Sequence, residues 1–208
     1  ELAVFLASRV ARALHYAHEK RDRTGDLLNV VHRDVSPVNV FASWQGVVKL
    51  ADFGIAKTLD ISGPDERKQI MGKVPYMSPE QARGDGTDRR TDLFALGLVL
   101  FEMLTGEQLY PTDDLREVMT MHKNKPIPSP REWNPAIPAE VEPFLRKLLE
   151  FDVEKRYQTG QAVVKDLEVF MYGGGYGPTN EKLAKYLHEL FPEVDKNRLL
   201  PEEVIKPQ

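Results

Sequence analysis

The chain has 208 residues, of which 41% are hydrophobic and 29% charged, so it can bury a core and is not disordered overall. Its net charge of −4 argues against a nucleic-acid module, which needs a basic surface to neutralise phosphates. The absence of cysteine excludes a disulfide scaffold, thiolate zinc and iron–sulfur sites, and a cysteine nucleophile. A cytoplasmic location is compatible with this composition.

No segment is expected to insert into a membrane. The longest apolar run, Leu93–Leu104, contains Glu102 and is too short for a bilayer, which a helix crosses with about 20 residues. The N-terminal segment also lacks the features of a signal peptide. Because the chain does not begin with Met, we expect it to be a fragment of a longer protein, which could be membrane-tethered.

The first part of the chain predicts one helix followed by short strands. Apolar residues recur every three or four positions from Leu2 to Ala17, which indicates an amphipathic helix ending near Glu19. A charged loop, 20–26, follows, and the polar stretch 60–73 predicts a second, exposed loop. Between these loops lie three β-rich runs, the last two joined by a turn at 44–46: 29–31, 38–42 and 47–50.

Beyond Thr87 the pattern is helical. The segment Thr91–Thr105 is apolar all round, and we therefore expect it to be buried at the centre of the fold. A proline-rich connector precedes two further helices, near 139–151 and 160–171. Three glycines at 173–175 then interrupt the chain, and a last amphipathic helix after Thr179 either docks on the domain or begins a linker. The predicted fold class is α+β, mainly α.

Three polar residues lie at turns around the predicted hairpin. Asn39 and Asp52 are at facing strand ends, where two oxygen ligands with open coordination suit Mg²⁺ that carries substrate phosphates. Asp34 lies five positions before Asn39, in a loop where a carboxylate could orient or deprotonate a hydroxyl. Each of the three taken alone is more simply explained as a turn former.

Taken together, these residues resemble the catalytic segment of the eukaryotic-type protein kinases, in their bacterial branch. The resemblance covers about residues 2–172 and implies the C-terminal lobe of a kinase. Residues 173–208 then form a glycine-rich break, a helix and a tail. The matching runs, in order, are His32-Arg33-Asp34 with Asn39, Asp52-Phe53-Gly54, Tyr76-Met77-Ser78-Pro79-Glu80, Asp92 with Gly97, and Lys155-Arg156-Tyr157.

The resemblance implies a role for each matching position. Asp34 resembles the residue that orients the substrate hydroxyl, whereas Asn39 and Asp52 resemble the ligands of Mg²⁺ or Mn²⁺. Phe41 resembles the apolar floor under the adenine of ATP. Arg33 resembles the arginine that binds a phosphate on the activation loop, here on Thr58 or Ser62. His32 and Phe53 resemble a stacked pair anchored by Asp92. Glu80 and Arg156 resemble a buried ion pair.

Two departures from the family pattern look reciprocal. The family usually has lysine two residues after the catalytic aspartate, where this chain has Ser36, and threonine after a later glycine, where this chain has Lys73. Phosphoryl transfer needs a positive group near the transferred phosphate, which Ser36 cannot supply. We hypothesise that Lys73 supplies the cation and Ser36 the hydroxyl. The alternative is that Lys73 points into solvent.

The resemblance therefore implies an ATP- and Mg²⁺-dependent kinase that phosphorylates Ser or Thr of a protein substrate. The glycine-rich loop and the lysine of the family's N-terminal lobe do not occur in this sequence, so we expect that lobe to come from the longer protein and the fragment alone to be inactive. Tyrosine kinases of the family usually carry arginine near the position of Ser36 in an Ala-Ala-Arg or Arg-Ala-Ala run, and neither run is present here. The alternatives are a pseudokinase, against which the intact Asp34, Asn39 and Asp52 argue, and a non-catalytic interaction lobe.

Overall fold

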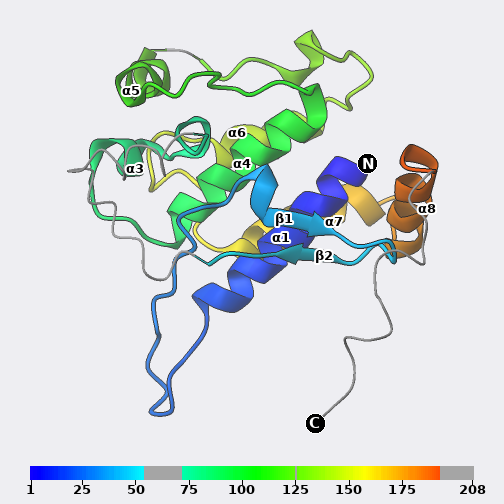
Figure 1. The fold of residues 1–208 in the computed structure, drawn as a ribbon, viewed down its shortest axis with the longest axis horizontal. Helices are drawn as coiled ribbons and strands as arrows, with labels where there is room; N and C mark the ends of the chain where they lie inside the picture. Colours follow the sequence, from blue (N-terminus) through cyan, green and yellow to red (C-terminus); the bar gives the residue numbers. More distant parts are fainter. Residues whose placement is uncertain (54–71, 125, 193–208) are drawn as a thin grey trace.

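The computed structural model describes residues 1–53, 72–124 and 126–192. Helices pack around one central helix, and a small two-stranded sheet lies across one face (Figure 1). The elements are α1 (Leu2–His18), η1 (Pro37–Asn39), β1 (Val40–Ala42), β2 (Val48–Leu50), η2 (Val74–Tyr76), α3 (Pro79–Arg83), α4 (Arg89–Thr105), α5 (Leu115–Asn124), η3 (Pro130–Glu132), α6 (Val141–Leu148), α7 (Gly160–Tyr172) and α8 (Asn180–Leu190).

The central helix is α4. Every residue from Thr91 to Phe101 is buried, which confirms the prediction of a helix enclosed on all sides. Gly97 permits α6 to approach closely, because a Cβ at this position would lie 2.9 Å from the Cβ of Leu148. Asp88 caps the helix by accepting a hydrogen bond from the amide of Arg90.

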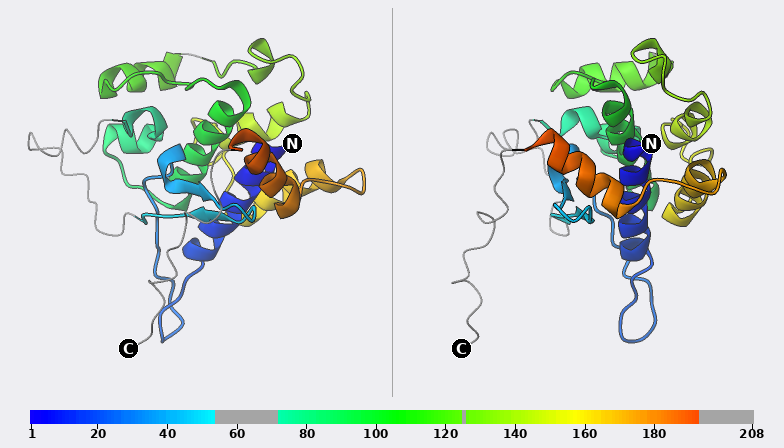
Figure 2. Two further views of the ribbon diagram at one scale, coloured as in Figure 1. Left: turned by 45° about the vertical axis from the view of Figure 1, so that its right-hand side comes forward. Right: turned by 90° about the vertical axis from the view of Figure 1, so that its right-hand side faces the viewer.

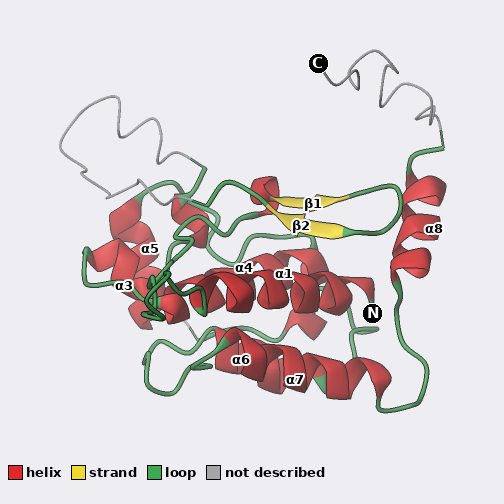
Figure 3. Cartoon of the chain, turned by 90° about the horizontal axis from the view of Figure 1, so that it is seen from below, coloured by secondary structure: helices red, strands yellow, loops and turns green. Residues whose placement is uncertain are grey.

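The elements stack in three layers (Figure 3). The hairpin forms the outer layer, α1 and α4 form the middle, and α6 and α7 form the opposite side. Gly160 permits α7 to pack tightly on α1, because a Cβ there would lie 2.7 Å from the carbonyl oxygen of Ala11. Apolar side chains of α1, including Phe5 and Leu14, are fully buried in the resulting core.

The hairpin pairs β1 and β2 antiparallel, with Val40 opposite Leu50. Val40, Val48 and Leu50 are half-buried and pack on the core. Phe41 alternates to the outer face, where 56% of its surface is exposed. The hairpin therefore has one face on the helices and one apolar side chain turned outward.

Several predicted elements differ from those observed. The run 29–31 was predicted as a strand, but no strand forms there, because Asn29 has φ of 47° and the chain turns toward the buried His32. Arg21 pairs instead with Leu27 in an isolated bridge. The helix predicted at 139–151 is shorter, Val141–Leu148. The predicted loop 60–73 lies outside the described residues except for its last two positions.

Helices α3 and α5 were not predicted as separate elements. Both are short, and α5 buries only Val118 and His122, so its apolar pattern is weak. No helix in the described ranges has the length and apolar character needed to cross a membrane.

Candidate active site

The loop that carries Asp34 is anchored by Asp92 of α4. Asp92 is fully buried, and its two carboxylate oxygens accept hydrogen bonds from the backbone amides of His32 and Arg33, each at 2.8 Å. His18, at the end of α1, lies 2.8 Å from the same carboxylate through its Nε2. Arg33 has φ of 62°, a left-handed conformation that costs energy in a non-glycine residue. The two bonds to one buried carboxylate hold this conformation in place.

The ring of His32 links this loop to the end of β2. Its Nε2 lies 3.0 Å from the carbonyl oxygen of Ala51, and its ring centroid lies 4.4 Å from that of Phe53. Because the carbonyl can only accept, Nε2 carries the proton and Nδ1 accepts from the amide of Asp34 at 3.3 Å. The contacts therefore place Asp34 and the residues after β2 in one connected unit.

The carboxylate of Asp34 contacts the ammonium group of Lys73. Lys73 Nζ lies 2.5 Å from Asp34 Oδ2, and the exposed fractions of the two side chains are 31% and 7%. Lys73 directly precedes η2, so the segment after residue 71 brings it to the loop. Ser36 is also buried, but its Oγ has no hydrogen-bond partner among the described residues. Of the two side chains, Lys73 therefore bonds Asp34 and Ser36 does not.

Asn39 and Asp52 lie at the same end of the hairpin. The amide of Ala51 donates to the backbone oxygen of Asn39 at 2.9 Å, which extends the ladder by one step toward Asp52. The side-chain Nδ2 of Asn39 donates to the backbone oxygen of Asp34 at 2.8 Å. Because Nδ2 is engaged in this bond, Oδ1 is the Asn39 atom that could bind a cation. The Asp52 residue is exposed.

This donor set fits Mg²⁺, which takes one or two protein oxygens and completes its octahedron with water and phosphate oxygens. No cluster of three His, Asp or Glu residues that could hold a metal by itself occurs in the part of the chain that the structure describes. The pair Asn39 and Asp52 would therefore bind the ion together with substrate phosphates. Asn39 is buried and Asp52 is open to solvent, so one candidate ligand is enclosed and the other is accessible.

A second ion pair joins α3 to the segment before α7. Arg156 NH1 and NH2 lie 2.8 Å and 3.2 Å from the two carboxylate oxygens of Glu80, and both side chains are buried. Thr91 donates a further hydrogen bond to Glu80. Burial opposes ionisation of Glu80, but the hydrogen bonds and charge of Arg156 outweigh it and hold the pKa of Glu80 below its ordinary value.

Several supporting contacts around the site were not predicted from the sequence. Gln81 donates from Nε2 to the backbone oxygen of Arg33 at 3.0 Å, so α3 contacts the loop directly. Ser78 and Gln81 also form a reciprocal capping box at the start of α3, and the spacing Ser-x-x-Gln is a signal that could have identified it. Tyr76 donates to Glu102 of α4 at 2.5 Å. Burial, reinforced by this carboxylate, raises the pKa of Tyr76 to about 12.

The side chains of some predicted site residues have no bond to this cluster that the structure shows. Phe41 is on the outer face of β1, and Arg33 has an exposed residue surface. Thr58 and Ser62 lie outside the described residues. The cluster itself comprises His32, Asp34, Asn39, Asp52, Phe53, Lys73 and Asp92.

Comparison with known proteins shows the family to which this chain belongs. Residues 1–167 match the family described as protein kinase domain, and the chain belongs to that family. It is 43% identical over 161 residues to the tyrosine-protein kinase MasK of Myxococcus xanthus, a stretch that covers 77% of this chain and 25% of MasK. It is 32% identical over 166 residues to the serine/threonine-protein kinase PrkC of Bacillus subtilis, covering 80% of this chain and 24% of PrkC.

A third relative is a probable serine/threonine-protein kinase of Clostridium perfringens, 41% identical over 169 residues that cover 81% of this chain and 23% of the relative. The chain thus spans about a quarter of the length of the curated relatives it matches. The bacterial relatives agree with the branch of the family that the sequence indicated, and they give no support to the pseudokinase alternative.

Proposed function

We propose that this chain is the C-terminal lobe, residues 1–172, of an ATP-dependent protein kinase that phosphorylates Ser or Thr of a protein substrate in the cytoplasm. The remaining residues form an appended helix and tail, and the N-terminal lobe comes from the same longer protein. The observation that carries the proposal is the bond from Asn39 Nδ2 to the backbone oxygen of Asp34, because it ties the candidate base to the candidate metal ligand at one edge.

In this proposal Asp34 accepts the proton of the substrate hydroxyl. The substrate oxygen forms a bond to the γ-phosphorus as the bond between that phosphorus and the departing ADP oxygen breaks. Asn39 Oδ1 and the Asp52 carboxylate hold Mg²⁺, or Mn²⁺ in its place, which when bound neutralises charge on the phosphates. Phe41 offers an apolar surface to adenine from the outer face of β1.

Lys73 takes the part of the lysine that the family usually has at the position of Ser36. An ammonium group has three donors and can bridge the Asp34 carboxylate and a phosphate oxygen. The distance of 2.5 Å to Asp34 supports this role. The buried hydroxyl of Ser36 then serves as a short hydrogen-bonding group beside the substrate hydroxyl. Because Ser36 is uncharged, it does not place a second cation next to Asp34.

Regulation and acceptor choice complete the proposal. We infer that Arg33, which is exposed, binds a phosphate on Thr58 or Ser62. A Ser/Thr acceptor is favoured because the Ala-Ala-Arg or Arg-Ala-Ala run typical of tyrosine kinases does not occur around Ser36, whereas the name of MasK favours tyrosine as the second candidate.

The test is a phosphoryl-transfer assay on the full-length protein with labelled ATP, followed by analysis of the phosphorylated amino acid. We expect Asp34→Asn to lower kcat about a thousandfold with little change in Tm, because proton transfer to a positioned carboxylate contributes about 10²–10⁴. The control is Asp152→Asn, which neutralises a half-exposed carboxylate whose ion pair with Lys155 spans 3.5 Å. Transfer should require Mg²⁺ or Mn²⁺ and yield phosphoserine or phosphothreonine.

Two outcomes would contradict the proposed mechanism, and a third would contradict only the proposed acceptor. Absence of transfer by the wild-type protein, to generic acceptors and to itself, would remove the kinase function. Full activity of Asp34→Asn would remove the role assigned to Asp34. Phosphotyrosine as the product would replace the acceptor class and leave the mechanism intact.

A further inference from the structure

Helix α8 lies beyond the residues that match the kinase family, which end at 167. It packs beside the turn that joins β1 to β2 (Figures 1 and 2). This is the hairpin whose other end carries Asn39 and Asp52. An element outside the family domain thus contacts the segment that bears both candidate metal ligands.

The contact is made by the ring of Trp44 at the turn. Its centroid lies 5.2 Å from that of His188, at an interplanar angle of 25°, and 6.2 Å from that of Phe191, at 87°. These are a stacked and an edge-to-face arrangement, the two that aromatic pairs prefer. The indole therefore contacts two aromatic side chains at the C-terminal end of α8.

The N-terminal end of α8 contacts the same turn through the backbone. Gly46 has φ of 73°, and a Cβ at this position would lie 1.8 Å from the carbonyl oxygen of Asn180. Only glycine permits this approach. Both ends of α8 therefore touch the turn, which makes the contact a specific fit rather than a single chance stack.

The turn is connected to the metal ligands by a very short ladder. Each strand has three residues, and the hairpin is closed by the bonds from Ser43 N to Val47 O and from Ala51 N to Asn39 O, both 2.9 Å. An isolated two-stranded hairpin is marginally stable in water. The geometry at Asn39 therefore depends on what holds the hairpin from outside, on the core side and at the turn.

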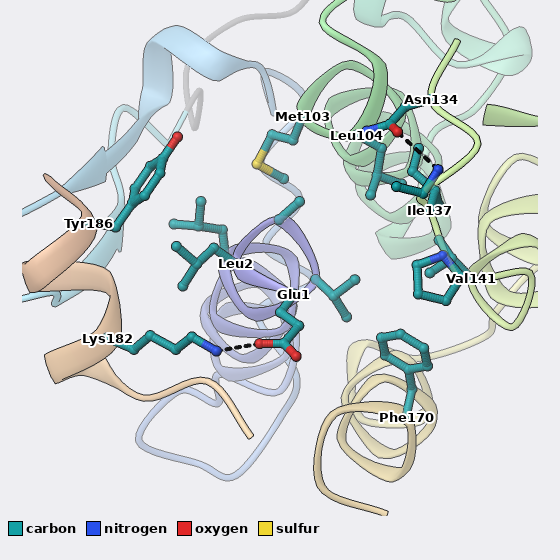
Figure 4. A pocket seen from close by; sticks show the side chains of 15 residues that line it. Glu1, Leu2, Met103, Leu104, Asn134, Ile137, Val141, Phe170, Lys182 and Tyr186 are labelled. Carbon is teal, nitrogen blue, oxygen red and sulfur yellow. Dashed lines mark hydrogen bonds and ion pairs between the residues drawn. The ribbon is translucent and has the colours of Figure 1, made fainter. Parts of the chain in front are cut away.

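The side of α8 toward α1 is only partly packed. An apolar pocket of about 600 Å³ separates them, lined among others by Leu2, Met103 and Tyr186 (Figure 4). Leu183 is the buried residue of α8 among those described, and Lys182 pairs with Glu1 across the mouth. Helix α8 is thus held by Leu183 in the core on this side and by the stack on Trp44 at the turn.

We propose that α8 is a positioning element for the metal-binding end of the hairpin, with Trp44 as the positioning residue through which it acts. By fixing the turn, the His188 and Phe191 side chains keep Asn39 and Asp52 in the spacing that Mg²⁺ with nucleotide requires. The appended helix thereby sets the affinity of the site for the metal–nucleotide complex. The effect on metal–nucleotide affinity rests on the proposed kinase function. The support of the hairpin by α8 rests on the contacts alone.

The experiment removes both aromatic contacts with the double variant His188→Ala and Phe191→Ala in the full-length protein. Its matched control is Lys185→Ala, which truncates a side chain of the same helix that is 78% exposed. The first measurement is amide hydrogen exchange in the peptide 40–51. We expect exchange in this peptide to become about tenfold faster in the double variant, while peptides of α7 are unchanged, because local opening of the hairpin alone is affected.

The second measurement separates KM from kcat for Mg·ATP. We expect the double variant to raise KM about tenfold with kcat within about twofold, since loss of a support behind metal ligands lowers metal affinity by about 10–100-fold. Trp44→Ala should reproduce this effect and Trp44→Phe should restore most of the affinity, because an aromatic ring can still stack.

Each result has a distinct meaning. Unchanged exchange in peptide 40–51 would overturn the proposal, whatever the activity. Faster exchange with unchanged KM for Mg·ATP would also overturn it, because the helix would then support the hairpin without setting affinity. Faster exchange in a protein whose wild type transfers no phosphate would confirm the structural part and reject the kinase function instead.

Discussion

Two ion pairs in this protein differ in what surrounds them. Arg156 and Glu80 are buried, with exposed side-chain fractions of 0% and 6%, and the guanidinium also donates to the backbone oxygens of Arg90 and Glu150. The Lys73 ammonium bonds a carboxylate that is nearly as buried, that of Asp34, but is itself 31% exposed. The first pair is closed off from any ligand, whereas the second has a cation that solvent or a substrate can reach.

The difference separates a structural charge pair from one that can take part in chemistry. A buried, bidentate arginine is fixed by its acceptors, and removing either partner leaves an uncompensated charge. A lysine is a flexible point charge that can be shared between a carboxylate and a phosphate. We therefore expect changes to the Glu80 pair to act on stability and changes to the Asp34 pair to act on turnover.

The largest effect on stability is expected from Arg156→Met. It leaves Glu80 buried without its cation, so the free energy of unfolding should fall by about 3–5 kcal/mol. Urea unfolding measures this, and the control is the neighbouring Lys155→Met, whose exposed pair with Asp152 should be worth less than about 1 kcal/mol.

The double variant Arg156→Met with Glu80→Gln tests the same prediction if Arg156→Met alone fails to fold. Combining it with Glu80→Gln removes the stranded charge, so the double variant should be more stable than Arg156→Met alone. If Arg156→Met and Lys155→Met lower the free energy of unfolding equally, the buried pair does not stabilise the fold more than an exposed one.

A smaller effect is expected at His122, which lies near the same ion pair. Burial, with the positive charges of Arg83 and Arg156, lowers the pKa of His122 to about 4, and the charge of Glu80 only partly opposes this. The native state thus excludes a proton that the unfolded chain binds below about pH 6.5. Stability should rise with pH from about 4 to 6.5 and be fully present above that range.

The drop in the pKa of His122 from 6.5 to about 4 corresponds to about 3 kcal/mol across this range. His122→Phe, which keeps a ring against Tyr110 and Phe94, should flatten the dependence on pH. Urea unfolding at pH 4.5 and pH 7 measures both proteins. The assignment is wrong if the variant loses as much stability on acidification as the wild type does.

The smallest effect is expected from Ser78→Ala, which removes the side-chain cap of α3. Loss of an N-cap costs about 1 kcal/mol, and α3 carries both Glu80 of the structural pair and Gln81, which bonds the backbone of Arg33. We expect a drop of this size in unfolding free energy and a kcat within about twofold. A larger loss of kcat would show that α3 also sets the geometry of the loop that carries Asp34.

The sequence predicts the parts of this protein that depend on local pattern. The buried α4 follows from an unbroken apolar run, and the hairpin follows from two β-rich runs around Gly46. The run 29–31 fails as a strand because the backbone there is directed by bonds from the next residues to Asp92, about sixty positions away. Local propensity contains no information about such a partner.

The candidate site was predictable as residue types and less so as contacts. The departures from the family pattern at Ser36 and Lys73 suggested from the sequence that the two residues act together. The 2.5 Å distance between Lys73 Nζ and Asp34 Oδ2, however, depends on how the segment 72–76 folds. The bond from Gln81 to Arg33 and the stack of His188 on Trp44 join distant segments through side chains with no periodic signature.

The central claim is that Lys73 acts in place of the lysine missing at Ser36. Its most direct test compares kcat of the full-length protein for Lys73→Thr and for the combined Ser36→Lys and Lys73→Thr, with Lys165→Thr as a control on the surface of α7. We expect Lys73→Thr to lower kcat about a hundredfold, as loss of one preorganised charge contact does, and the reciprocal double variant to regain most of it. Wild-type kcat in Lys73→Thr, or no recovery in the double variant, would contradict the claim.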